Sequence, residues 1–75
     1  MQSVPAKRLA TRLRQFMKDT GTTQNQAAAA LHMSQSAFSR RYLGHVELRA
    51  SEVAALASLL GIEVTDLYGD SAVSA

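Results

Sequence analysis

The residues that end helices constrain this chain more than any other feature of its sequence. Turn residues recur at short intervals, at Gly21, at the pair His32-Met33, at Gly44 and at Gly61. The longest uninterrupted stretch with helical periodicity, from Val4 to Thr20, covers less than a quarter of the 75 residues. A chain divided in this way can form several short helices around one small core, and at this length it forms a single domain.

The first stretch has a clear apolar stripe. Leu9, Leu13, Phe16 and Met17 recur at helical spacing, which predicts a helix over residues 4–20. The expected helix ends are Ser3 as the N-cap, Pro5 in the first turn and Gly21 as the terminator, and the expected outer side carries Lys7, Arg14 and Lys18.

The remaining segments repeat this pattern on a smaller scale. "TTQNQAAAALH" begins with a capping threonine, Thr22 or Thr23, and "SQSAFSRRYL" begins with the capping Ser34. "SEVAALASLLG" is strongly apolar, and "IEVTDLYG" supports one short amphipathic turn. No convincing strand or repeat is present, so we predict an all-α fold, a compact bundle of four to five short helices over residues 1–69, with residues 70–75 as a frayed tail.

The charge is divided unevenly along the chain. Residues 1–49 hold all eight Lys and Arg against two acidic residues, which gives +6, whereas residues 50–75 hold four acidic residues, which gives −4. A basic half of this kind is either a solvated face or a surface for a polyanion, most often a nucleic acid.

Composition also excludes several classes of protein. The chain has no cysteine, which removes disulfides and thiolate metal sites, and no apolar run approaches the length of a membrane span. The N-terminal segment lacks the apolar stretch of a secretory signal. We therefore expect a soluble intracellular protein, cytoplasmic in a bacterial host and associated with its nucleoid.

The segment "AAAALHMSQS" explains how two of these helices meet. Only "HM" separates them, which requires a tight turn and a steep crossing, and close crossing requires small side chains at the contact. Ala28 should lie under the following helix while Ala27 and Leu31 face the core. Alanines also favour any helix, but helix propensity alone does not explain the turn, the serine cap and the basic ending together.

With these residues, the chain resembles the helix-turn-helix domains of phage Cro proteins and immunity repressors, the lambda-repressor-like family. The similarity rests on "TQNQAAAALHMSQSAFSRRYLG" and on "LASLLGIEVTDLYG", and it extends from about Leu9 to Leu67. It implies a transcription regulator that binds double-stranded operator DNA in the major groove with the helix over residues 34–43.

The resemblance also assigns roles to single residues. It implies base reading by Gln35, Ser36, Ser39 and Arg40, whose side chains suit this role because Gln pairs with adenine, Arg with guanine and Ser with either. It implies phosphate binding by Gln24, to which we add Thr23, Ser34 and Arg41.

Three positions depart from the family pattern. His32 stands where the family usually has a glycine in the left-handed backbone conformation; a metal or pH-sensing role is the less favoured reading. Met17 and Tyr42 together stand where many members pair Arg with Glu, from which we infer an apolar contact. Arg41 stands where an apolar residue is common, and we expect it to swing toward the DNA backbone while Tyr42 packs.

The expected oligomeric state follows from the small number of base pairs that one recognition helix can contact. A single recognition helix cannot select an operator, so we expect a homodimer on an imperfect palindrome with half-site centres about 10 base pairs apart. Its expected contact residues are Ile62, Val64, Leu67 and Tyr68. We expect no enzyme activity, cofactor, metal, membrane or small-molecule ligand. The alternatives are an antitoxin-type protein-binding module and the DNA-binding domain of a longer repressor.

Overall fold

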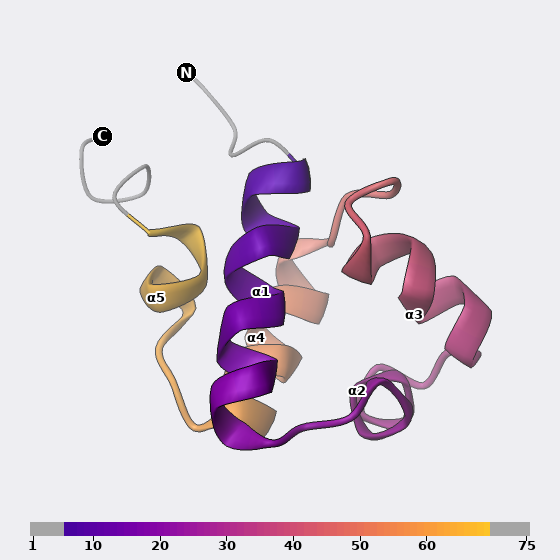
Figure 1. Cartoon of the computed structure of the whole chain (residues 1–75), viewed down its shortest axis with the longest axis horizontal. Coiled ribbons are helices and arrows are strands. Elements are labelled where there is room, and N and C mark those ends of the chain that lie inside the picture. Colours follow the sequence, from indigo (N-terminus) through magenta and orange to yellow (C-terminus); the bar gives the residue numbers. More distant parts are fainter. Residues whose placement is uncertain (1–5, 70–75) are drawn as a thin grey trace.

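The computed structural model describes residues 6–69, which form five α-helices and contain no strand. The helices are α1 (Ala6–Thr20), α2 (Gln24–Ala30), α3 (Gln35–Tyr42), α4 (Ala50–Leu60) and α5 (Val64–Tyr68) (Figure 1). The all-α prediction is confirmed. The predicted start at Val4, its cap Ser3, Pro5 and the tail 70–75 lie outside the described residues.

The first connection follows the predicted glycine stop. Gly21 has φ +72°, and beyond it the Thr22 N–H donates to the Met17 carbonyl at 2.9 Å. Of the two candidate caps for α2, Thr23 is the one used: its hydroxyl accepts from the Gln26 N–H at 3.1 Å, and the Gln26 side-chain oxygen accepts from the Thr23 N–H at 2.8 Å. This reciprocal capping box fixes where α2 begins.

The turn between α2 and α3 is as tight as its sequence predicts. His32 has φ +55° and is the only non-glycine residue with a positive φ in the described part of the chain, which confirms its predicted left-handed conformation. The Ser34 hydroxyl then accepts from the Ala37 N–H at 3.1 Å and starts α3. Histidine therefore holds a backbone conformation that usually costs a side chain with a Cβ about 1–2 kcal/mol.

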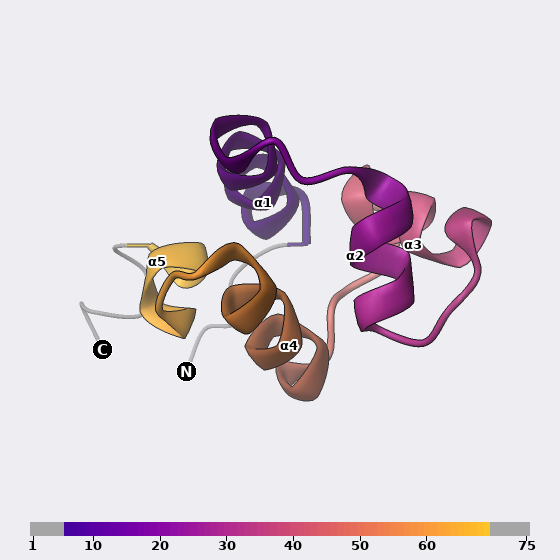
Figure 2. The same cartoon turned by 90° about the horizontal axis from the view of Figure 1, so that it is seen from below.

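The core lies between α1, α4 and the α2–α3 pair. Figures 1 and 2 show α1 and α4 in the middle of the molecule, with α2 and α3 on one side and α5 on the other. Ala27 and Ala28 are buried on α2, which packs against α3 and α4, and the half-buried Leu31 packs against the same core. Ala27 and Leu31 therefore face the core as predicted. The buried apolar side chains are Leu9, Ala10, Leu13, Met17, Ala27, Ala28, Phe38, Val53, Leu56, Ala57, Leu60 and Leu67.

α5 docks on α1 and α4, where Leu67 enters the core and Tyr68 packs against it. Leu67 is fully buried in the core, so its predicted place in a dimer contact is wrong. Leu67 is the buried residue of this five-residue helix, and it fills the chain's own core. The Arg12 guanidinium donates to the Asp66 carbonyl from Nε at 2.9 Å and from Nη2 at 2.6 Å, which ties α5 to α1.

Within residues 6–69, none of the helices combines the length and the apolar character that crossing a membrane requires.

Candidate nucleic-acid interface

The outer side of α3 is polar and accessible. Gln35, Ser36 and Arg40 are exposed, Ser39 is half-buried, and Phe38 on the inner side is fully buried. Phe38 fixes the rotation of α3 about its axis, because turning the helix would expose this ring. The four predicted base-reading residues therefore lie on a short helix with a defined outward face.

α2 lies beside α3 at the same end of the molecule in both views (Figures 1 and 2). At the start of α2, Thr23 is exposed and Gln24 half-buried, and Ser34 is exposed at the start of α3. Helix N-termini direct partly positive N–H groups outward, which suits phosphate oxygens. Neither helix contains an acidic residue, so nothing on them opposes a polyanion.

Arg41 is held within the fold. Its Nε lies 3.2 Å from Glu52 Oε1 on α4, its Nη1 donates to the Ala37 carbonyl at 3.0 Å, and its side chain is only 18% exposed. The same Glu52 oxygen accepts from the Arg49 N–H at 2.9 Å. Arg41 therefore links the end of α3 to the start of α4, and its contact with DNA phosphate stays a prediction.

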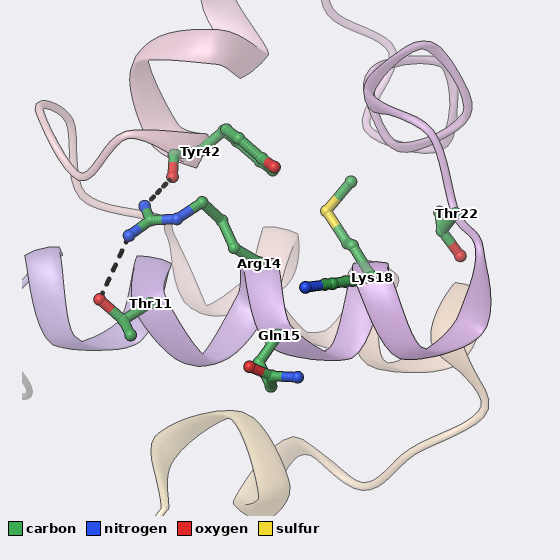
Figure 3. A pocket seen from close by; sticks show the side chains of 7 residues that line it. Thr11, Arg14, Gln15, Lys18, Thr22 and Tyr42 are labelled. Carbon is green, nitrogen blue, oxygen red and sulfur yellow. Dashed lines mark hydrogen bonds between the residues drawn. The ribbon is translucent and has the colours of Figure 1, made fainter.

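Arg14 has a partner that its place in the sequence does not indicate. Its Nη1 donates to the Tyr42 carbonyl at 2.6 Å, and its guanidinium carbon lies 5.7 Å from the centroid of the Tyr42 ring (Figure 3). Arg14, which the sequence places on the outer side of the first helix, is therefore half-buried against α3. Tyr42 and the buried Met17 both line one cleft, so the two positions at which the resemblance implies an Arg–Glu pair hold a methionine and a tyrosine, with Arg14 beside them.

The described part of the chain contains no group of side chains suited to binding a metal ion. Between residues 6 and 69 no three His, Cys, Asp or Glu side chains are grouped closely enough to hold a metal ion together. Both histidines, His32 and His45, are exposed.

Two short helices joined by a tight turn, the second with a polar outer face, form the arrangement by which many proteins enter the major groove of DNA. Comparison with known families agrees with this geometry. The family described as "Helix-turn-helix domain" matches residues 8–67, which is most of the chain, and the protein belongs to this helix-turn-helix DNA-binding family. Comparisons with curated proteins and with solved structures give no significant match.

Proposed function

We propose that the protein is a sequence-specific transcription regulator of the Cro or immunity-repressor type, which reads double-stranded operator DNA in the major groove with α3. The observation that carries this proposal is the outer face of α3, where Gln35, Ser36 and Arg40 are exposed on a helix fixed by the buried Phe38. The function requires neither catalysis nor a cofactor, and its proposed place is the bacterial cytoplasm, at the nucleoid.

Each side chain of this face has a suitable base partner. The amide of Gln35 can pair with adenine, the guanidinium of Arg40 can bind guanine in two places, and the hydroxyls of Ser36 and Ser39 can donate to or accept from either. Each good bidentate pair contributes about 1–3 kcal/mol of discrimination against the wrong base. Phosphate contacts at Thr23, Gln24 and Ser34 would set the register of α3 in the groove.

We further propose that two copies bind an imperfect palindrome. With Leu67 buried, the apolar side chains left at least partly exposed around α5 are Leu59, Ile62, Val64 and Tyr68, named here the α5 patch. Leu59 is 41% exposed and Val64 37%. Joining two α5 patches would direct both α3 helices away from the two-fold axis, toward successive major grooves about 34 Å apart.

The two neighbouring arginines of α3 provide the test of base reading. Selection of bound fragments from a random duplex library should yield one preferred site. Arg40→Ala should weaken binding to that site by roughly 1–3 kcal/mol and relax the preference at one base pair, because its guanidinium is exposed and reads a base.

Arg41→Ala is the matched control. It should weaken binding to all sequences about equally and lower the free energy of unfolding by about 1–2 kcal/mol, since it removes the bond to Glu52. Binding is measured by fluorescence anisotropy and unfolding by urea titration. A loss of base preference in Arg41→Ala but not in Arg40→Ala would show that the assignment of the reading face is wrong.

A further inference from the structure

A cleft of about 430 Å³ opens between α1 and the end of α3. Its lining does not include the proposed base-reading residues of α3. Figure 3 shows Arg14 and Tyr42 on one side of it and Lys18 and Thr22 on the other. Two of its side chains are cationic, most others are polar, and none is acidic. Its lining residues are Thr11, Arg14, Gln15, Met17, Lys18, Thr22 and Tyr42.

The two cations of the cleft differ in how they are held. Arg14 is fixed in place by the Tyr42 carbonyl and ring, and its Nη2 lies 3.4 Å from the Thr11 hydroxyl. Lys18 is exposed, and among the described residues no hydrogen bond or ion pair engages its ammonium group. One positive charge is therefore preorganised in the cleft, and a second can turn toward whatever enters.

From this arrangement we infer that the cleft binds a phosphate group of the DNA backbone. Two cations with hydroxyl groups and no carboxylate suit a phosphate oxygen better than a neutral or cationic group. The DNA backbone is the favoured source because of position: Thr22, at the edge of the cleft, is followed directly by Thr23 and Gln24 at the start of α2.

This inference rests on the proposed function and extends it. A strand whose phosphates pass the start of α2 would reach the cleft next, so α1 would anchor the same strand that the start of α2 positions. Such a contact is independent of sequence, because phosphates carry no base information. It adds affinity and register, while the choice of site stays with α3.

The test uses Lys18→Ala, because removing Arg14 would also disturb Tyr42. Arg8→Ala is the matched control: Arg8 is an exposed cation on α1 that does not line the cleft. Affinity is measured by fluorescence anisotropy at several salt concentrations, on the preferred duplex and on an unrelated one. Lys18→Ala should weaken binding to both duplexes equally, by roughly 2- to 5-fold per bound chain, and Lys18→Arg should restore it.

The salt dependence identifies the contact as one with phosphate. The slope of log affinity against log salt should become shallower by about one for each bound chain in Lys18→Ala, and it should stay unchanged in Arg8→Ala. An unchanged slope in Lys18→Ala, or an equal change in both variants, would overturn the inference. In either case Arg40→Ala still reports base reading, so the proposed function is judged separately.

A titration with inorganic phosphate distinguishes the two possible ligands, a phosphate group of the DNA backbone and a free phosphate ion. In amide NMR spectra of the free protein, phosphate should shift the signals of Lys18 and Thr22 only weakly, and duplex DNA should shift them strongly. If phosphate alone saturates the cleft while the DNA-bound spectrum leaves these signals unmoved, the cleft is a site for a free anion and the DNA anchor is refuted.

Discussion

At the scale of single residues, Gly44 lies where the connection between α3 and α4 passes close to the backbone of α1. Its φ is +83°, and a Cβ built there would lie 2.9 Å from the Lys7 Cα atom, which belongs to the backbone of α1 and cannot move aside. Gly21 has a similar φ of +72° but open space around it. Substitution at Gly21 therefore tests backbone strain alone, whereas substitution at Gly44 tests backbone strain together with close packing.

We expect Gly44→Ala to destabilise the protein much more than Gly21→Ala. Gly21→Ala should lower the free energy of unfolding only by the left-handed backbone strain, about 1–2 kcal/mol. Gly44→Ala adds to this strain a clash that pushes the α3–α4 connection away from α1. Free energies of unfolding from urea titration followed by circular dichroism give the comparison. Equal losses in the two variants would show that the approach of Gly44 to Lys7 contributes nothing.

At the scale of elements, the contact between α1 and α3 joins Arg14 to Tyr42 and lies beside the buried Met17. Met17→Arg places a charge at a side chain that is only 3% exposed and near the Arg14 guanidinium. It should lower the free energy of unfolding by about 3 kcal/mol or more, because the new charge is buried without a partner. Unfolding by urea measures the loss.

Adding Tyr42→Glu should recover part of that loss by supplying a carboxylate for the new arginine. The double-mutant cycle gives the coupling between the two positions, and each single variant is its control. Strictly additive losses would mean that the side chains at positions 17 and 42 do not interact.

The sequence predicts these elements well where the signal is local. Thr23 and Ser34 cap helices that begin at the next residue, and Gly21 and His32 adopt left-handed conformations, because each of these features depends on neighbours a few residues away. The outer and inner faces of α3 follow from helical periodicity in the same way.

Local sequence patterns do not predict the partners of long, flexible side chains or the inward side of a very short helix. Arg14 binds Tyr42, 28 residues along the chain, and Arg41 binds Glu52, 11 residues along the chain. Nothing in the local pattern of either arginine indicates these partners. Leu67 was misplaced because five residues of helix show too little periodicity to tell which apolar side chain turns inward.

At the scale of the whole molecule, α3 and α5 lie at opposite ends of its longest axis (Figures 1 and 2). This separation gives the proposed dimer a specific test in Val64→Glu. Val64 is partly exposed in the first turn of α5, where an acidic side chain is compatible with the helix, so the fold should persist. Two such charges facing each other across a two-fold axis should prevent pairing.

We therefore expect Val64→Glu to abolish cooperative binding of two chains to the palindrome while binding to a single half-site is retained. Ala54→Glu, an exposed position on α4 outside the α5 patch, is the control for added charge. Sedimentation of protein–DNA mixtures gives the stoichiometry. Unchanged cooperativity in Val64→Glu, or equal affinity for palindromes with two to five base pairs inserted at the centre, would refute a dimer joined through this patch.

The accessible side chains of α3 contribute little to holding the protein together. Gln35 and Arg40 form no side-chain hydrogen bond or ion pair with the described residues, while Phe38, Arg41 and the Ser34 cap anchor the helix. Descendants of this protein can therefore exchange the residues at positions 35 and 40 without lowering the stability of the fold. The divergence of binding preferences among such descendants would then be limited by the supply of mutations and by selection on their targets, and not by the need to stay folded.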